Sequence, residues 1–385
     1  MAHPITRFGP NEFPYVPFYT LAYSPDGETL RVAVLPPSAV SGPPYRIELW
    51  NGRSKKLERT LSSGNSGRQA FLSHLALSSD GKTAAVARPN GDLQLWQMEA
   101  PKDLKKLNRT PSPTQWTMTT EFSPDGQTLL ESRGDGGNFV KRYAGRILLW
   151  DAHTGQLQRT LNTGGNTVLS FLLSPDGQTV IGNGIYALQA WDARTSALLY
   201  KTGTPYNGLA ALSPDGRTLA TRDAKRNVVL RDARTGAARG NVGGKDGVND
   251  LTFAPDSQTL ATVSNQFKLG FPLASGKNGA LFADGPIRRV PTQGEISLWD
   301  VATRARVRTF KNAGKAIGTA LFSPDGQVLA AASENQTVLW NAQTGALLRR
   351  LSGHTQPVIA LAFAPDGRTL ATGDEAGKVL MWRLK

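Results

Sequence analysis

The chain contains no cysteine, so disulfide bonds, thiol nucleophiles and thiolate metal ligands are all excluded. It has no run of 18 or more consecutive apolar residues, so it shows no transmembrane segment. The first residues, Met1–Arg7, lack the basic and then apolar order of a secretory signal, so we expect a cytoplasmic protein, with an extracytoplasmic one as the alternative if the natural chain begins earlier.

Groups that carry catalysis are also scarce. The four histidines, His3, His74, His153 and His354, stand far apart, and no nucleophile elbow, zinc spacing or Walker loop occurs. The Gly-rich stretch 134–138 holds one carboxylate, which is too few for a calcium loop. We therefore expect no enzyme, no catalytic residue, no metal ligand and no cofactor.

Acidic residues are outnumbered, with 30 carboxylates against 44 lysines and arginines and a net charge of +14. Such an excess favours an anionic partner but says nothing about the fold.

A tight-turn signature, by contrast, occurs eight times at a spacing near 40 residues, and each copy precedes a short segment that ends in Trp or Arg. The turns begin at Ser24, Ser78, Ser123, Ser174, Ser213, Ala254, Ser323 and Ala364, and the closing residues are Trp50, Trp96, Trp150, Trp191, Arg231, Trp299, Trp340 and Trp382. Self-similarity at this period indicates an array of one supersecondary unit.

The last repeat shows what this unit is. Val358–Phe363 is an apolar run of strand length, and the Pro365, Asp366 and Gly367 that follow have hairpin turn chemistry. Residues 369–372 and 378–382 form the next two strands, and in the other repeats a second turn leads to a fourth. Four-stranded antiparallel units stacked radially make a β-propeller.

Literal Trp-Asp pairs at Trp150, Trp191 and Trp299, and the Gly-His pair at His354, make these repeats resemble those of the WD-repeat family. The family often has a buried His–Ser/Thr–Trp–Asp network in each blade. The resemblance maps this network onto His354, Thr372 and Trp382, with Ala376 at the Asp position, so we expect that no blade keeps it complete. The Ser-Pro-Asp-Gly turns and the lack of cysteine favour a bacterial member.

We predict an all-β, single-domain, eight-bladed propeller over residues 1–385, with seven blades as the alternative if one repeat is a decoration. Residues 18–385 hold the eight repeats, and 1–17 form a closing strand and a Pro-rich lead-in. The last repeat stops after its third strand, and Ile5–Phe8 resembles the outer strands of other repeats. We therefore expect this segment to complete the last blade.

Three repeats depart from the common length. From turn Asp to closing residue, five repeats measure 15 or 16 residues, but repeats one, three and six measure 24, 25 and 43. The surplus lies between second and third strands, and in a meander these connections emerge on one face, opposite the Ser-Pro-Asp-Gly turns. Three long loops on one face of a rigid ring are typical of a binding surface.

The three segments, 31–46, 131–146 and 264–294, carry seven of the fourteen net positive charges and several aromatics. We predict binding residues there: Arg31, Tyr45, Arg46, Arg133, Phe139, Lys141, Arg142, Tyr143, Arg146, Lys268, Phe271, Lys277, Arg288 and Arg289. Arginine and aromatic residues anchor protein interfaces, and they also grip nucleic acid through phosphate contact and stacking.

We therefore predict a non-catalytic scaffold that binds an acidic protein through this basic, loop-rich face. The alternatives are a propeller that binds nucleic acid or another polyanion, and an enzyme with a site at the central channel.

Overall fold

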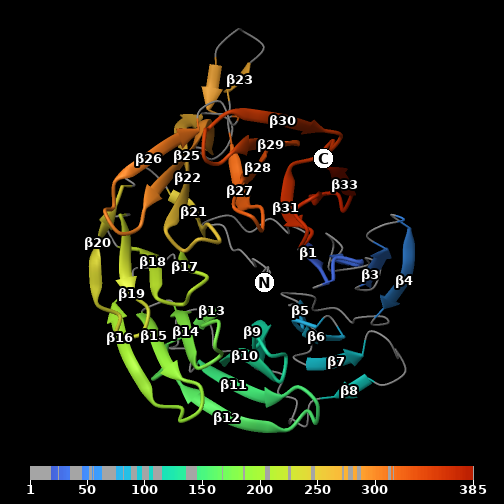
Figure 1. Ribbon diagram of the computed structural model, residues 1–385, viewed down its shortest axis with the longest axis vertical. Coiled ribbons are helices and arrows are strands. Elements are labelled where there is room, and N and C mark those ends of the chain that lie inside the picture. Colours follow the sequence, from blue (N-terminus) through green and yellow to red (C-terminus); the bar gives the residue numbers. More distant parts are fainter. Residues whose placement is uncertain are drawn as a thin grey trace.

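The computed structural model describes residues 19–24, 26–34, 46–51, 54, 56–62, 75–80, 82–87, 93–97, 104–106, 115–135, 145–166, 168–184, 187–203, 209–223, 227–243, 248–270, 273–275, 281–283, 288–310, 314 and 316–384. Within these residues all regular structure is β-sheet, and the sheets stand like blades around a common centre (Figure 1). The predicted eight-bladed propeller is confirmed.

Each blade takes its strands in chain order from the centre outward. Blade 1 contains β1 (Tyr19–Tyr23), β2 (Thr29–Val34), β3 (Arg46–Asn51) and β4 (Leu57–Ser62), and blade 2 contains β5 (Leu75–Leu77), β6 (Thr83–Ala87), β7 (Leu93–Gln97) and β8 (Leu104–Lys106). Blade 3 contains β9 (Gln115–Phe122), β10 (Thr128–Asp135), β11 (Arg146–Asp151) and β12 (Leu157–Asn162). Blade 4 contains β13 (Val168–Leu173), β14 (Thr179–Gly184), β15 (Ala187–Asp192) and β16 (Leu198–Gly203).

The next four blades follow the same antiparallel order. Blade 5 contains β17 (Ala210–Leu212), β18 (Thr218–Arg222), β19 (Val228–Asp232) and β20 (Ala238–Val242), and blade 6 contains β21 (Val248–Phe253), β22 (Thr259–Gly270), β25 (Arg288–Asp300) and β26 (Arg306–Phe310). Blade 7 contains β27 (Ile317–Phe322), β28 (Val328–Ser333), β29 (Gln336–Asn341) and β30 (Leu347–Ser352). Blade 8 contains β31 (Val358–Phe363), β32 (Thr369–Asp374) and β33 (Val379–Arg383).

The turn signature, which reads Ser-Pro-Asp-Gly in five of the eight blades, makes the first hairpin of each blade. In blade 3 the Ser123 hydroxyl donates to Asp125 Oδ1 at 2.5 Å and accepts the Thr128 N–H at 2.9 Å. Gly126 adopts φ 72°, a left-handed conformation that glycine takes without steric cost. Serine therefore fixes both ends of the turn, and aspartate holds its middle.

The core lies between blades rather than within them. Eight clusters of buried apolar residues fill the eight interfaces between neighbouring blades of the described structure. Between blades 3 and 4, for example, Ile147, Leu161 and Val168 pack with Trp191, which is 1% exposed. Because each sheet buries both faces, no blade can be stable alone.

The ring closes through the interface of blades 8 and 1. Leu21 and Val32 pack there with Ala362 and Ala371, so β1 lies beside β31. The turns of blades 1 and 8 also meet, because a Cβ added to Gly27 would lie 3.3 Å from Cδ of Pro365. Blades 8 and 7 meet in the same way, since a Cβ added to Gly367 would lie 3.8 Å from Cδ of Pro324. The predicted closing segment Ile5–Phe8 lies outside the described residues, and blade 8 has three strands within them.

The long connection of blade 6 is largely strand, not the loop predicted over 264–294. Strands β22 and β25 stay paired out to Gly270 opposite Arg288, and β23 (Leu273–Ser275) pairs with β24 (Leu281–Ala283) farther along the chain. The pairing lets the backbone N–H and C=O groups of a long connection bond to each other. We call residues 266–293 the blade 6 arm; β23 extends outside the ring in Figure 1.

Candidate interaction surface

A hydrogen-bond network fixes the last blade from within. His354, which precedes β31, binds Asp374 Oδ2 through Nδ1 at 2.8 Å and Thr372 Oγ1 through Nε2 at 2.6 Å. Trp382 Nε1 donates to the same threonine oxygen at 2.9 Å. His354 is 4% exposed, and Thr372 and Asp374 are fully buried.

The expectation that no blade keeps the complete network was therefore wrong. The carboxylate is Asp374, at the end of β32, and not the residue at position 376. Its second oxygen accepts the N–H groups of Ala376 and Lys378, so one side chain holds both the His354 ring and the turn to β33. Every donor and acceptor points into the blade, which makes the network structural.

Other blades keep part of this arrangement with different side chains. Trp299 Nε1 donates to Thr262 Oγ1 at 3.0 Å. In blade 5, Arg231 replaces tryptophan, and its Nε donates to Thr221 Oγ1 at 3.3 Å. In these two blades the closing residue supplies an N–H to the second strand, whether it is tryptophan or arginine.

Blade 3 has a carboxylate at the threonine position. Glu131 is fully buried, and it accepts the Thr117 hydroxyl at 2.7 Å and Trp150 Nε1 at 3.0 Å. Arg133 Nε lies 3.8 Å from the same carboxylate, and its side chain is only 12% exposed. Arg133, predicted to bind a partner from a loop, is therefore a strand residue turned toward a buried charge.

The other predicted binding residues fall into two groups. The side chain of Arg146 is exposed at the start of β11, directly opposite Arg133 in the ladder. Arg31, Arg46, Lys268, Arg288 and Arg289 lie on strands β2, β3, β22 and β25. Tyr45, Phe139, Lys141, Arg142, Tyr143, Phe271 and Lys277 lie outside the described residues.

The strand ladders bring some of these positions together. In blade 1, Arg46 pairs with Val34, at the end where β2 and β3 lead into their connection. In the arm, Leu269 pairs with Arg289 and Gly270 with Arg288, one and two residues beyond Lys268. Three basic residues therefore lie within a few positions of one another on the arm.

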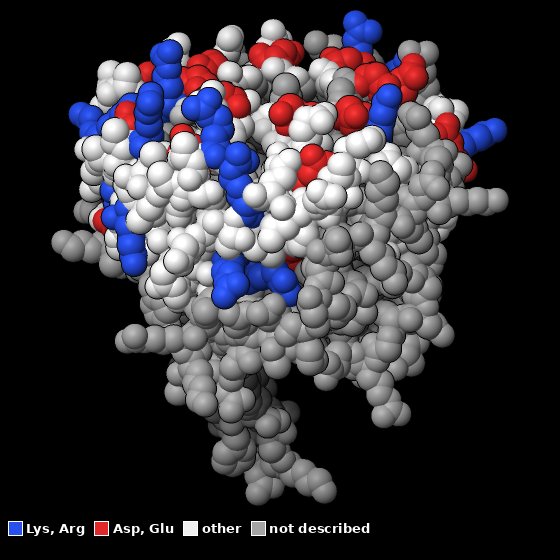
Figure 2. All heavy atoms as spheres, turned by 90° about the horizontal axis from the view of Figure 1, so that it is seen from below, with Lys and Arg blue, Asp and Glu red and all other residues white. Residues whose placement is uncertain are grey.

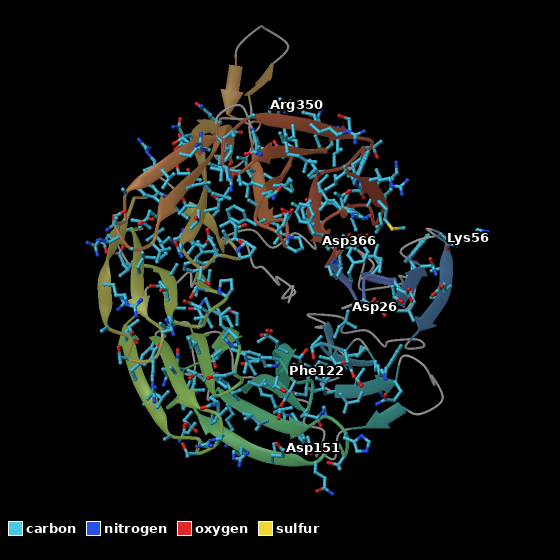
Figure 3. The ribbon with its side chains drawn as sticks, in the orientation of Figure 1. Asp26, Lys56, Phe122, Asp151, Arg350 and Asp366 are labelled. Carbon is cyan, nitrogen blue, oxygen red and sulfur yellow. The ribbon has the colours of Figure 1, made fainter. Side chains whose placement is uncertain are left out.

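The opposite face, which carries the two sets of hairpin turns, is ringed with aspartates. Asp26 and Asp366 lie near the centre of the ring and Asp151 near its outer side (Figure 3). The N–H of Thr154 lowers the pKa of the Asp151 carboxyl, and equivalent contacts from Thr195 and Thr303 lower the pKa of Asp192 and Asp300. Figure 2 shows the carboxylates gathered along one edge of the disc, with lysines and arginines among and below them.

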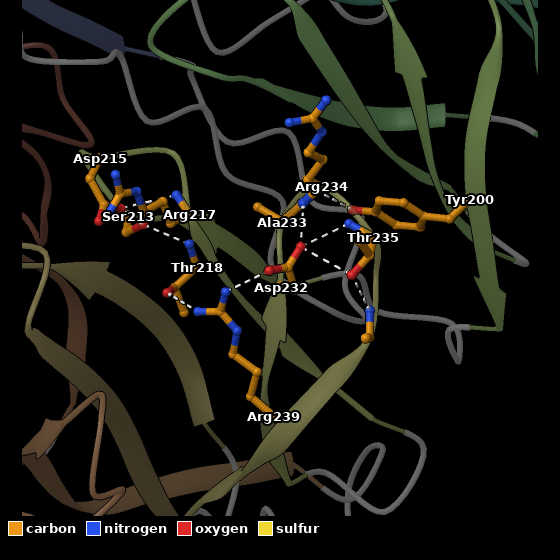
Figure 4. Close-up of polar contacts among 11 residues, drawn as sticks. Tyr200, Ser213, Asp215, Arg217, Thr218, Asp232, Ala233, Arg234, Thr235 and Arg239 are labelled. Carbon is orange, nitrogen blue, oxygen red and sulfur yellow. Dashed lines mark hydrogen bonds and ion pairs between the residues drawn. The ribbon is translucent and has the colours of Figure 1, made fainter.

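These turn carboxylates are engaged in holding the backbone. In blade 5, Asp232 Oδ1 accepts the N–H of Arg234 and of Thr235, and Oδ2 binds Arg239 at 2.6 Å (Figure 4). Tyr200 of blade 4 donates to the carbonyl of Ala233, and burial raises its pKa to about 12. This cluster links strands and neighbouring blades, and we assign it no chemistry.

Within the described residues, no group of three or more His, Asp or Glu side chains could hold a metal ion. The same part of the chain contains no helix long and apolar enough to cross a membrane.

Comparison with known proteins identifies two of the repeats. The family model "WD domain, G-beta repeat" matches residues 304–341 and 345–383. The chain is 29% identical over 294 residues to periodic tryptophan protein 2 of Arabidopsis thaliana, covering 76% of this chain and 30% of that protein. It is 34% identical over 147 residues to target of rapamycin complex subunit wat1 of Schizosaccharomyces pombe, covering 37% of this chain and 44% of that one.

A chain in the crystal structure of mitotic checkpoint complex shares the fold, with a TM-score of 0.57 and 20% identity over 85% of this chain and 91% of that chain. The present chain spans less than half of the length of the two relatives above.

The chain is a β-propeller that contains WD repeats. The two matched WD repeats are offset from the blades by one strand, since 304–341 holds β26 to β29 and 345–383 holds β30 to β33. Each of these repeats thus supplies the outer strand of one blade and the three inner strands of the next, which ties neighbouring blades together.

Sequence reasoning missed where else positive charge gathers on this WD-repeat ring. The seven described outer strands hold ten basic residues and a single carboxylate, Glu58. The basic residues are Arg59, Lys105, Lys106, Arg159, Lys201, Arg239, Arg306, Arg308, Arg349 and Arg350. This concentration of charge could have been predicted from the sequence, because Arg-Thr and Arg-Arg pairs recur near the ends of the outer strands. The sequence pattern was used only to recognise the outer strands.

Proposed function

We propose that this WD-repeat propeller is a non-catalytic scaffold that holds an acidic protein partner on its loop face. The observation that carries the proposal is the blade 6 arm, a paired extension of the sheet whose two strands contain Lys268, Arg288 and Arg289. A paired hairpin loses less conformational entropy on binding than an open loop of equal length.

The relatives support a role in assembly. One is named as a subunit of the target of rapamycin complex, and the structural neighbour belongs to the mitotic checkpoint complex. The buried hydrogen bonds support the same role. Those of His354 and Glu131 connect residues of their own blades, so they stabilise the ring as a platform for a partner.

Charge reversal tests the proposal. Changing Lys141, Arg142, Arg288 and Arg289 to glutamate lowers the net charge from +14 to +6. We expect the protein to fold, because surface substitutions usually stay within about 0.5 kcal/mol each. Capture of the native partner, followed by mass spectrometry and then by titration against salt, should fall sharply.

Arg217 and Arg368 provide the control, since both follow hairpin turns on the opposite face and are exposed. Their reversal should leave capture unchanged. Equal loss in both variants would refute the loop face as the interface. Binding of generic DNA or RNA that falls steeply with salt would favour the polyanion alternative.

A further inference from the structure

The outer strands share a β-bulge at their second residue. In blade 7, Trp340 pairs with Leu347 and Leu339 with Arg349, so Leu348 is the extra residue. The same shift occurs in six of the seven described outer strands, and the bulged residues are Glu58, Gln158, Leu199, Arg239, Val307 and Leu348. The bulge turns this residue away from the ladder.

In blades 1, 3 and 5 the bulged residue binds the turn that precedes its strand. Glu58 accepts from Asn51 at 2.7 Å, Gln158 donates to Asp151 at 3.0 Å, and Arg239 donates to Asp232 at 2.6 Å. A polar side chain at the bulge therefore has a structural purpose in this fold.

Blades 4, 6 and 7 have an aliphatic residue there instead, which cannot make this bond. Leu199 is 43% exposed, Val307 58% and Leu348 52%. The neighbouring Leu347, at 53%, adds to the same surface. Each of these side chains leaves about half of its apolar surface in water.

Blades 6 and 7 are neighbours, so Val307 and Leu348 belong to one region of the rim. Arg308 of β26 donates to the carbonyls of Gln343 and Thr344, at the turn that leads into β30. Arg306, Arg349 and Arg350 are exposed on the same two strands, and Figure 3 shows Arg350 at the outer edge of the ring. We call this region, β26 and β30, the blade 6–7 rim.

The blade 6–7 rim is free of negative charge along the chain. No carboxylate occurs between Asp300 and Asp325, or between Glu334 and Asp366. The arginines of this convex edge suit a negatively charged surface, and the exposed aliphatic residues suit an apolar one. An occupant that offers both, and that can adapt to the curved edge of the ring, fits this region best.

Other occupants fit less well. An added β-strand would meet a bulge in each outer strand, which disrupts edge pairing. A second copy would oppose four arginines to four arginines. Nucleic acid would use the arginines but gain nothing from the leucines and the valine, because its recognition depends on phosphate contact and on stacking with aromatic rings.

We propose that the blade 6–7 rim docks edge-on to an anionic lipid bilayer, with Val307, Leu347 and Leu348 entering the interface and the arginines contacting lipid headgroups. Aliphatic insertion and attraction of basic residues to anionic lipid add to each other in such binding. The proposal concerns a different surface from the loop face, so the two can fail separately.

Flotation with vesicles tests it, using phosphatidylcholine alone and phosphatidylcholine with about 30% phosphatidylserine. The variant carries Val307→Gln and Leu348→Gln, which copies the natural Gln158 of blade 3 and keeps every charge. Arg308 and Arg349 remain untouched because each bonds to the next blade. The control is Leu199→Gln at the equivalent bulge of blade 4.

We expect the parent and the control to float with the anionic vesicles only, and the double variant to bind them at least about tenfold more weakly. Arg306→Gln with Arg350→Gln should weaken binding in the same vesicles. The proposal is overturned if the parent does not float, if it floats equally with neutral vesicles, or if all aliphatic variants bind alike. Loss of partner capture with unchanged flotation would also overturn it, by assigning the rim to a protein.

Discussion

In several blades an oxygen on the second strand accepts an N–H from the closing residue. Threonine or glutamate supplies the oxygen, and tryptophan or arginine supplies the N–H. Thr372 and Thr262 accept from tryptophan, Glu131 also accepts from tryptophan, and Thr221 accepts from Arg231. What the repeat preserves is a donor facing an acceptor in a dry site, where a missing partner would cost about 1–3 kcal/mol. The identity of each side chain is free to vary within that requirement.

Replacing His354 with alanine should lower the free energy of unfolding by about 1–3 kcal/mol, because it removes the ring that hydrogen-bonds to the fully buried Asp374 and Thr372. Urea unfolding beside the parent measures this loss. Partner capture by the folded variant should be unchanged, since the ring is 4% exposed. Full stability together with lost binding would instead give His354 a direct role in recognition.

At the scale of the strand, the sequence predicted more about turns than about long connections. The turn signature favours a tight hairpin and recurs with small changes, so all eight first hairpins could be located from residues alone. The extent of β22 and β25 could not, because Phe267, Leu269 and Val290 sit among glycines and prolines that read as loop. Asp374 was misplaced for a similar reason, since its role depends on where β32 ends and not on a fixed spacing.

Shortening the blade 6 arm should separate binding from folding. A variant in which residues 267–292 are replaced by Asn-Gly would still pair Ser264 with Glu295 and keep the core residues Val263 and Ile296. We expect its melting temperature to match that of the parent closely, because the arm extends beyond the interblade core. Thermal unfolding followed by circular dichroism checks this, and a large fall would mean that the arm packs on the ring.

At the scale of the whole molecule, the ring closes through the apolar interface of blades 8 and 1, and we predict that an N-terminal strand adds to it. The apolar interface of blades 8 and 1 is present, but the side chains of β33 are half-buried, whereas Trp340 at the equivalent position of blade 7 is 3% exposed. A fourth strand would cover them. From Phe8 to Tyr19 there are 10 intervening residues, within the 5 to 12 that link each described outer strand to the next inner strand.

Deleting residues 1–10 should therefore lower the melting temperature and promote aggregation, because an open apolar edge would be exposed. Light scattering and calorimetry measure both effects. A truncated protein that melts with the parent and stays monomeric would contradict closure by Ile5–Phe8.

Acid should weaken the ring as a whole through its turn aspartates. The pKa values of Asp151, Asp192 and Asp300 are lowered by hydrogen bonds from the turns they cap. Because the folded pKa lies below the unfolded value of about 3.9, this stabilisation is complete above that pH and is lost as pH falls through the folded pKa. Changing all three to asparagine, which caps the same turn at Asn341 in blade 7, should keep the fold and reduce the fall in melting temperature between neutral pH and about pH 3. An unchanged pH dependence in this variant would show that these three turn aspartates do not carry the acid sensitivity.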